Sequence, residues 1–457
     1  MPTSWRVLPL FIGSVLSATA GPKVLPVLNH PIKDRSGLAG FPLTVDLRAA
    51  FGVELIDDQV VRFTSQFISG GMPVVMDMAL FSNRTPVTRQ NFLKYVSDGD
   101  YVNSFIHRSV PGFVIQGGAS RTVSNSFQAV PTDPPIVNEF GISNTLATVS
   151  MAKLGGNPDS ATSQWFVSLG SNSDILDPQN GGFTVFGRMT KTSFANAQLF
   201  GNPAVFPIYN YGGIYTELPV TKSHVFPNLR TTELILFPSV ALAPMPIGEA
   251  GENTTLTYSV VSNSNPALVS TSIGPDGLLA LSPMAGQAGV VTLAVRATDS
   301  VGNAVDDQFI LSVNLTDTYT TWASRNPFPG AQSDPTANPD GDAWNNLQEF
   351  AFMGNPAISN PTREVVFPQM SGVTPAAKYL TITFPVRKFT QGMAYAVEAN
   401  SGLLEAWTEI WNSAAGFTHP QVLTIMDQAD RTVVTIKDTA TAETAPKRFL
   451  RIRVVKQ

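Results

Sequence analysis

Two proline-rich segments constrain this chain most, because proline cannot donate the backbone hydrogen bonds that continue a helix or a sheet. They lie at residues 237–246 and 326–339. The chain has 457 residues, whereas a single hydrophobic core stops growing at about 250–300 residues. We therefore expect several folded units, with the proline-rich segments acting as linkers between them.

The composition limits the class of protein. Hydrophobic residues make up 43% of the chain and charged residues 14%, which excludes an intrinsically disordered protein. The net charge is −5 and no basic run occurs, so nucleic acid is not an expected partner. There is no cysteine, which excludes disulfides, thiol nucleophiles and cysteine-bound zinc. Glycine and proline contribute 35 residues each, and so many turn formers favour a mainly β, multidomain protein.

Residues 1–20 have the three parts of a secretory signal peptide. Arg6 carries the positive charge, residues 7–16 are mostly apolar, and Ala18-Thr19-Ala20 forms a cleavage motif. Ten residues are too few to cross a bilayer, and no other apolar run approaches the ~20 residues that a membrane helix needs. We expect an exported protein without a membrane span, located in the periplasm, on the cell surface or in the medium. Export without cysteine favours a bacterial source. An ordinary buried N-terminal segment is the alternative.

The remaining chain divides into five regions. Residues 21–71 form an N-terminal extension in which short alternating runs predict one or two strands. Residues 72–230 form a mixed block with the densest motifs. Residues 237–316 and 364–457 alternate at period two, which predicts strands, and residues 326–358 form a linker rich in proline and aspartate.

The block at 72–230 begins with a predicted strand at 73–80. Thr85 or Thr88 then caps a predicted helix that runs through Val96, and Gly99 ends it. The motifs that follow, in chain order, are Ile106-His107-Arg108, Pro111-Gly112-Phe113, Gln116-Gly117-Gly118, Asn138-Glu139-Phe140, residues 148–152, residues 159–166, Leu176-Asp177 and residues 183–188.

These motifs, in this order, resemble those of the cyclophilin-type peptidyl-prolyl cis–trans isomerases. The resemblance implies a closed β-barrel with flanking helices and an enzyme that acts on X–Pro bonds of proline-containing polypeptides. Rotation about such a bond has a barrier near 18–20 kcal/mol, because amide resonance stiffens it. No bond breaks, so the reaction requires no cofactor. A donor aimed at the proline nitrogen stabilises the twisted state, in which that nitrogen becomes basic.

The resemblance also assigns roles to individual residues. It implies that Arg108 is the donor and that Gln116 bonds a substrate carbonyl or supports Arg108. The substrate-binding residues that it implies are Phe113, Val114, Ala152, Lys153, Gln164, Phe166, Leu176 and Phe183. It implies that Phe113, Val114, Phe166 and Leu176 seat the proline ring, and that Ala152, Lys153 and Gln164 lie where the peptide backbone docks.

Other interpretations stay open. Taken singly, the apolar residues are as typical of a core as of a binding site. We expect His107 to be structural and not a general base. Ile175 and Phe183 stand where many eukaryotic members have tryptophan and histidine. The alternative function is a non-catalytic protein that binds proline motifs, or attaches to a surface, on the same fold.

The regions after residue 237 carry different patterns. Alternating runs at 255–261, 278–281, 289–298 and 307–313 predict an immunoglobulin- or cadherin-like β-sandwich that serves as a spacer or a binding surface. Residues 364–457 predict a further β-module, because they contain similar runs.

A calcium loop is predicted in the second linker. Asn338, Asp340, Asp342 and Glu349 have the oxygen-bearing side chains and the spacing of a looped structural calcium site. Ala343 stands where an EF-hand needs glycine, so the loop resembles instead the thrombospondin- or dockerin-like loops of exported bacterial proteins. The alternative is an acidic turn in which Asp342 caps the helix that follows.

Overall fold

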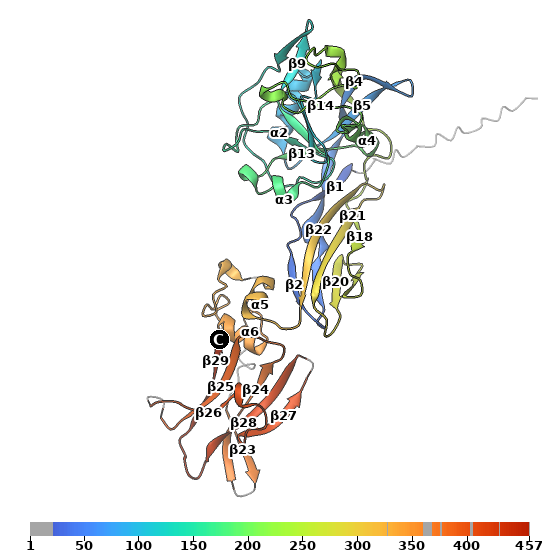
Figure 1. Ribbon diagram of the computed structural model, residues 1–457. Helices are drawn as coiled ribbons and strands as arrows, with labels where there is room; N and C mark the ends of the chain where they lie inside the picture. The colour runs from blue at the N-terminus through green and yellow to red at the C-terminus, as the bar shows by residue number, and fades with distance from the viewer. Residues whose placement is uncertain are drawn as a thin grey trace, which may run out of the picture.

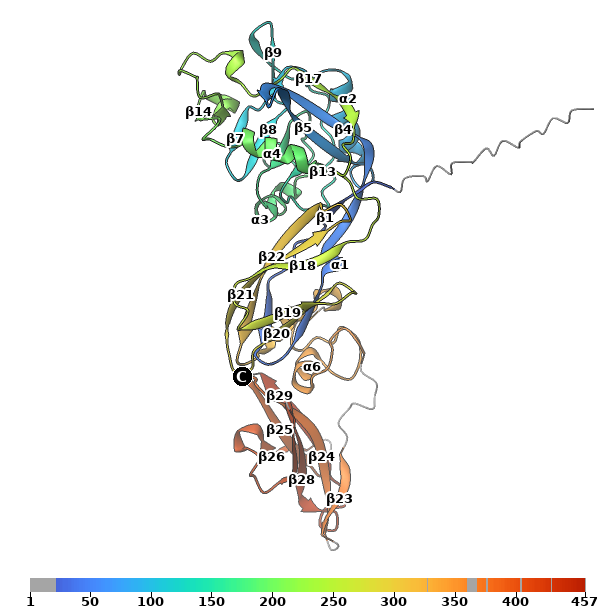
Figure 2. The ribbon, with the colours of Figure 1, turned by 90° about the vertical axis from the view of Figure 1, so that its right-hand side faces the viewer.

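The structure is a computed structural model that describes residues 22–326, 328–359, 368–374, 377–402, 405–428 and 430–456. The expected signal peptide lies outside these residues. Figure 1 shows three β-rich bodies that follow one another along the chain, and the view in Figure 2 agrees. No helix in the described part of the chain is long and apolar enough to cross a membrane.

The first body is built on a nine-stranded sheet in the order β1-β4-β5-β13-β11-β12-β8-β7, with β17 also paired to β4. These strands are β1 (Val24–Leu28), β4 (Phe51–Ser69), β5 (Met72–Phe81), β7 (Arg108–Val110), β8 (Val114–Gly117), β11 (Thr148–Met151), β12 (Trp165–Ser168), β13 (Val185–Met189) and β17 (Ser239–Pro244). The strand expected at residues 73–80 is β5.

The expected closed barrel is not found among the described strands, because the path of pairing ends at β1 on one side and β7 on the other. The strands that could have linked the two ends form a sheet of their own, in the order β10-β9-β6-β16. They are β6 (Ser104–Phe105), β9 (Ser120–Val123), β10 (Ser126–Ala129) and β16 (Leu236–Phe237). Their backbone groups bond to one another, so none of them joins β7 to β1.

Helices and short elements cover this sheet. The predicted helix is α2 (Pro86–Ser97), with Thr85 at the N-cap position and Pro86 in the first turn, where proline has no bond to lose. Rings from α2 and the sheet pack together in the core, for example Phe92 of α2 against Phe186 of β13, with ring centroids 4.9 Å apart. The other elements are α3 (Ser173–Leu176), α4 (Lys191–Phe200), β14 (Ile208–Tyr209), β15 (Leu218–Pro219), η1 (Gln179–Gly181), η2 (Gly213–Tyr215) and η3 (Thr231–Glu233).

The N-terminal segment 21–71 is divided between two bodies. Strands β1 and β4 belong to the first sheet, whereas β2 (Arg35–Leu38) and β3 (Leu43–Asp46) pair with strands of the second body. The short helix α1 (Leu47–Ala50) lies between β3 and β4. The expected boundary at 71/72 thus separates β4 from its hydrogen-bonded neighbour β5. A fragment that begins at Met72 would lose Phe63 from the core, so residues 72–230 are not self-contained.

The segment 237–246, which the sequence predicts to be a linker, is largely a strand in the structure. Residues 239–244 form β17, which pairs with β4 from Ser239–Thr64 to Pro244–Gln59. Pro244 fits because it stands at the end of an edge strand, where its missing N–H costs little.

The second body is a two-sheet sandwich. One sheet has the order β18-β21-β22-β2 and the other β19-β20-β3. Their facing sides bury a core that includes Val291, Leu293 and Leu311. The expected runs correspond to β18 (Thr257–Asn263), β20 (Leu278–Pro283), β21 (Gly289–Thr298) and β22 (Ala304–Asn314), and β19 (Val269–Ile273) is additional. Kinship with immunoglobulin-like domains stays a prediction.

The third body contains two further sheets, in the orders β23-β24-β28-β27 and β26-β25-β29. Trp344, Phe384 and Trp411 lie in the core. The elements are α5 (Tyr319–Arg325), η4 (Pro329–Ala331), α6 (Asn346–Phe352), β23 (Gln369–Thr374), β24 (Ala377–Arg387), β25 (Met393–Asn400), β26 (Thr408–Asn412), η6 (Ser413–Ala415), β27 (Val422–Asp427), β28 (Arg431–Thr441) and β29 (Phe449–Lys456).

Buried polar contacts join the first body to the sandwich. Arg188 of β13 donates to the carbonyl oxygen of Pro26 in β1, at 2.9 Å, and to that of Ala304 in β22. Burial lowers the pKa of Arg188 to about 10. The carboxylate of Glu249 accepts from the backbone N–H of Lys191, at 2.6 Å, at the positive N-terminal end of α4. The bond from Arg188 to Ala304, and a bond of 3.0 Å from Nδ2 of Asn303 to the carbonyl oxygen of Glu249, join the two bodies.

Asp307 of β22 makes this junction sensitive to pH. Its side chain is 6% exposed and accepts from the backbone N–H of Ile32 at 2.6 Å. Burial is the main cause that raises the pKa of Asp307 from 3.8 to about 6, and the nearby carboxylates of Asp174 and Asp177 in the first body raise it further. Between these values the folded protein binds a proton that the unfolded chain has released, so stability falls as the pH rises through this window.

We therefore expect Asp307→Asn to stabilise the protein by roughly 1–3 kcal/mol near neutral pH and to have little effect near about pH 4. Asparagine keeps an acceptor for Ile32 and carries no charge. Chemical unfolding of the full chain at both pH values measures the difference. The matched control is Asp306→Asn on the same strand, where an exposed pair with Arg296 is lost. Equal pH dependence of the two variants would contradict the assignment.

Candidate active site

The hairpin of β7 and β8 places Arg108 directly opposite Gln116. Its turn depends on Gly112, whose φ of +72° lies in the left-handed region that glycine tolerates. The backbone N–H of Phe113 donates to the carbonyl oxygen of Val110 at 3.0 Å and closes the turn. Two residues eight positions apart therefore meet on neighbouring strands, where their side chains can act together.

The polar side chains of the site form a row. Arg108 Nη1 donates to Gln116 Oε1 at 3.4 Å, and Gln116 Nε2 donates to Gln164 Oε1 at 2.9 Å. Gln164 directly precedes β12, and its carbonyl oxygen accepts from the backbone N–H of Ala152 at 2.9 Å. The row crosses three strands and is half-buried, so its side chains keep a solvent-facing side.

The apolar residues that the resemblance implied lie together in one cluster beside this row. Val114, Phe166 and Leu176 are buried in it, and half-buried Phe113, Ala152 and Phe183 pack against them. Phe166 and Phe183 meet edge-on with ring centroids 5.7 Å apart. Asn172 Nδ2 donates to the carbonyl oxygen of Phe113 at 2.9 Å and fixes the backbone behind that ring. We call these six residues the apolar cluster.

Lys153 belongs to the rim of the apolar cluster, but its ammonium group is occupied. Lys153 Nζ donates to the carbonyl oxygen of Asn180 at 2.8 Å and to that of Gly182, and it lies 5.0 Å from the ring centroid of Phe183. Burial lowers the pKa of Lys153. The side chain thus ties the loop that carries Phe183 to the end of β11.

His107 is buried behind Arg108. The residue is 2% exposed. Burial, assisted by the charge of Arg108, lowers the pKa of His107 to about 4. It is therefore neutral at physiological pH. Its backbone N–H donates to the carbonyl oxygen of Gln116 at 3.1 Å, within the hairpin. The position suits a structural role.

One residue of the site carries no sequence signal. Arg108 Nε donates to Glu217 Oε2 at 2.6 Å. Glu217 directly precedes β15 and lies beyond all the motifs described above, in a segment without clear periodicity. Only the fold brings it to Arg108, so motif analysis could not have found it. Ile175, the expected rim position, lies on α3 and is exposed.

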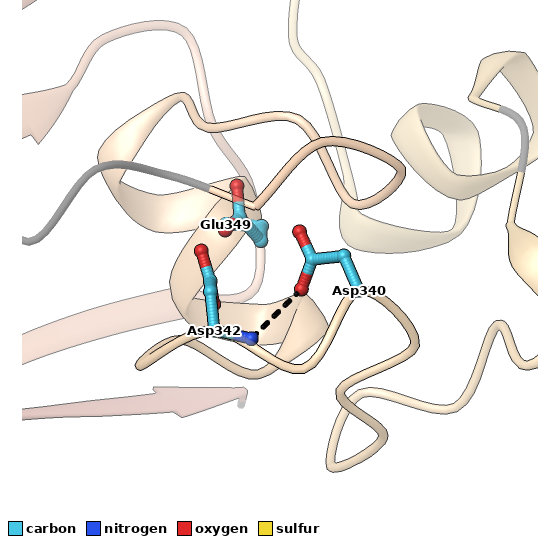
Figure 3. Close-up of side chains that lie close together, drawn as sticks. All are labelled: Asp340, Asp342 and Glu349. Carbon is cyan, nitrogen blue, oxygen red and sulfur yellow. Dashed lines mark hydrogen bonds between the residues drawn. The ribbon is translucent and has the colours of Figure 1, made fainter.

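A second candidate site lies in the third body. Figure 3 shows Asp340, Asp342 and Glu349 close together, and one oxygen of each lies within 4.8 Å of the others. Glu349 is 1% exposed, and Asp340 Oδ2 is buried without a hydrogen-bond donor among the described residues. Asn338 is engaged with the loop: its Oδ1 accepts from the N–H of Gly341 at 3.0 Å, and its Nδ2 donates to the carbonyl oxygen of Asp342 at 2.7 Å.

The alternative for this loop, in which Asp342 caps the helix, is wrong. Helix α6 begins after Asn345, whose side chain accepts from the N–H of Gln348, and Gln348 bonds back to the N–H of Asn345. This reciprocal capping box leaves Asp342 outside the helix. Asp342 Oδ1 accepts instead from the N–H of Trp344 at 2.7 Å, within the loop.

Residues 70–198 match the family model described as cyclophilin type peptidyl-prolyl cis-trans isomerase/CLD. The chain therefore carries a cyclophilin-type domain. It is 36% identical over 119 residues to a peptidyl-prolyl cis-trans isomerase of Acinetobacter baylyi, covering 25% of this chain and 61% of the relative. It is 37% identical over 119 residues to peptidyl-prolyl cis-trans isomerase A of Dickeya dadantii, covering 25% and 60%.

A third relative is peptidyl-prolyl cis-trans isomerase B of Escherichia coli, 38% identical over 99 residues, with 21% of this chain and 57% of the relative covered. This chain thus spans less than two thirds of the length of each of these relatives. A solved cyclophilin-type isomerase of Cryptosporidium parvum aligns with 41% of this chain and 99% of its own, at 21% identity and a TM-score of 0.28.

The glycines of the hairpin allow a matched test of the site's scaffold. Gly118 has a φ of +79°, and a Cβ there would lie 2.3 Å from the carbonyl oxygen of Ser163. Gly112 has a similar φ of +72°, but a Cβ there would meet nothing within 4 Å. Gly112→Ala should therefore cost only backbone strain, about 1–2 kcal/mol.

Gly118→Ala adds a backbone clash to the same strain, so we expect it to cost at least about 2 kcal/mol more than Gly112→Ala, as other overpacked sites do. Urea unfolding of the two full-length variants measures this difference. Equal destabilisation would show that the hairpin moves freely away from Ser163.

Proposed function

We propose that this protein is a peptidyl-prolyl cis–trans isomerase that assists the folding of exported proteins. The observation that carries the proposal is the juxtaposition of Arg108 and Gln116 with the apolar cluster. A permanently charged donor beside an apolar seat fits both parts of a twisted X–Pro bond. The match of residues 70–198 to the isomerase family supports the same conclusion.

In the mechanism that we propose, the proline ring packs on Phe113, Phe166 and Leu176. Arg108 Nη2 makes no hydrogen bond with a described residue, so it can donate to the proline nitrogen when that nitrogen becomes pyramidal. Gln116 bonds the carbonyl oxygen of the substrate or holds Arg108. The planar isomers offer a poorer acceptor, so the donor lowers the barrier instead of strengthening ground-state binding.

The peptide backbone has a separate docking edge in this proposal. Ala152, Lys153 and Gln164 lie at the ends of β11 and β12, next to the apolar cluster. The reaction needs no cofactor, because no bond breaks and no charge is transferred. Phe183 and Ile175 form the rim, where they would govern which side chains fit beside proline.

Arg108→Ala should lower kcat/KM by roughly 10²–10³, because one preorganised donor to the transition state is lost. Phe113→Ala should weaken the binding of a proline-containing peptide as well as turnover, because its apolar contact is present in both states. Isomerisation kinetics and peptide affinity of the full chain measure both effects. Arg121→Ala is the control, since Arg121 pairs with Asp100 elsewhere in the same domain.

The results separate the two functions. A wild-type protein that binds the peptide and does not accelerate isomerisation would establish the alternative, a non-catalytic protein that binds proline motifs. An active wild type whose rate survives Arg108→Ala would place the donor elsewhere.

The remaining parts of the chain would serve in export and in holding the isomerase domain in place. We propose that residues 1–20 direct secretion, to the periplasm, the cell surface or the medium, and that the sandwich is an immunoglobulin-like spacer. The contact of Arg188 with Ala304 of β22 supports a spacer, because a direct bond between the two bodies restricts the orientation of the isomerase domain. The third body would be a β-module for attachment.

We further propose that Asp340, Asp342 and Glu349 bind a structural calcium ion. Carboxylate oxygens are the ligands that calcium prefers. The burial of Asp340 Oδ2, which has no hydrogen-bond donor among the described residues, supports this, because charged oxygens away from water need compensation. Asn338 would act by closing the loop.

Calcium at about 1 mM, a level suited to extracellular sites, should raise the Tm of the transition that involves Trp344, because the ion binds only the folded loop. Tryptophan fluorescence during heating of the full chain measures this shift. Asp340→Asn should abolish the shift, whereas Asp334→Asn, outside the cluster, should keep it. No shift in the wild type would contradict the calcium proposal.

A further inference from the structure

We infer that Glu217 is the positioning residue for Arg108, and that this chain supplies it from a segment beyond the part that matches the isomerase family. The inference rests on the proposed function, in which Arg108 is the donor. The family match ends at residue 198, whereas Glu217 lies in the excursion between α4 and β16. The site is thus completed by a segment that the family match does not cover.

The guanidinium of Arg108 is held on two sides. Glu217 Oε2 accepts from Nε at 2.6 Å, and Gln116 Oε1 accepts from Nη1 at the longer distance of 3.4 Å. A guanidinium is planar, so anchors at Nε and Nη1 determine where Nη2 points. The short contact to Glu217 is the stronger of the two, because both of its partners are charged, whereas the longer bond joins Arg108 to a neutral amide.

The backbone around Glu217 is itself fixed. The N–H of Ser109, next to Arg108, donates to the carbonyl oxygen of Glu217 at 2.8 Å, which joins the two residues by backbone as well as side chain. Leu218 and Val220, which follow Glu217, are buried in a small core with Phe105 and Leu234. Glu217 therefore presents its carboxylate from a rigid position and not from a mobile loop.

The exposure of the pair indicates a functional and not a stabilising role. The side chains of Arg108 and Glu217 are 35% and 37% exposed, and ion pairs as open as this contribute little to folding stability. The effect of the pair on the reaction rate can be much larger, because a small displacement of a donor can reduce the rate about 100-fold. Loss of Glu217 should therefore affect turnover far more than stability.

A double-mutant cycle tests this inference, since it measures whether two residues act through each other. Glu217→Ala should lower kcat by about 10- to 100-fold and change the affinity for a proline-containing peptide less than about twofold, because the apolar cluster is untouched. In the Arg108→Ala background, Glu217→Ala should cause no further loss. Glu217→Gln, which keeps an acceptor of the same length, should recover most of the activity lost in Glu217→Ala.

Asp100→Ala is the matched control, because it removes a carboxylate from another arginine, Arg121, in the same domain. Equal losses from Glu217→Ala with and without Arg108 would overturn the inference, since the effect would then be structural. A rise in kcat on removal of Glu217 would also overturn it, and would identify a carboxylate that weakens the donor. A wild type without isomerase activity would instead overturn the proposed function, and the inference with it.

Discussion

The antiparallel pairing of β4 with β5 is the contact on which the first body depends. β4 bonds along its length to β1, β5 and β17, and its residues Val61 and Phe63 enter the main core. From β5 the sheet continues without a break through β13, β11, β12 and β8 to β7, where Arg108 lies. Each register in that series fixes the next, so the position of Arg108 follows from a strand distant in sequence. A strand cannot shift by one residue against its neighbour, because successive side chains alternate between the two faces and the shift would move every side chain to the wrong face.

The same N-terminal residues connect the cyclophilin-type domain to the sandwich. The chain enters the first sheet at β1, contributes β2 and β3 to the sandwich, and returns as β4. Because the N-terminal segment passes from the first body to the sandwich and back, the two bodies can move less independently than two domains joined by a single linker. The two bodies also interact electrostatically at the junction, because the carboxylate of Asp177 in the first body raises the pKa of Asp307 in the sandwich. Asp177 directly follows Leu176 of the apolar cluster. Asp177 in turn accepts from Nδ2 of Asn144 at 2.9 Å.

Local features were predictable from the sequence, whereas pairing between distant segments was not. The strand β5 and the helix α2 follow from periodicity and capping residues. Phe113, Val114, Phe166 and Leu176, which the resemblance assigned to one apolar pocket, pack in one cluster, and their role in substrate binding stays a prediction. Alternation in residues 43–47 indicates a strand, but it cannot tell which sheet that strand joins. The segment 237–246 looks like a linker because of its prolines, yet the free edge of β4 offered it a partner. The closed barrel was wrong for a related reason, since β6 and β16 bond to each other instead of completing the ring. Glu217 shows the limit most clearly, because an ion pair formed by tertiary structure leaves no periodic trace.

The partners of Arg108 orient its guanidinium and also offset its charge. On one side the guanidinium contacts a carboxylate, and on the other it leads into the amide row of Gln116 and Gln164. Pairing with Glu217 reduces the net charge of the site, so long-range attraction cannot account for how it would act on a neutral proline nitrogen. What the pairing would preserve, in the proposed mechanism, is the orientation of the guanidinium of Arg108. A reaction whose transition state differs from its ground state mainly in one lone pair depends on that orientation. In the proposed reaction, the carboxylate of Glu217 would therefore hold the donor, and Phe113, Phe166 and Leu176 would hold the proline ring.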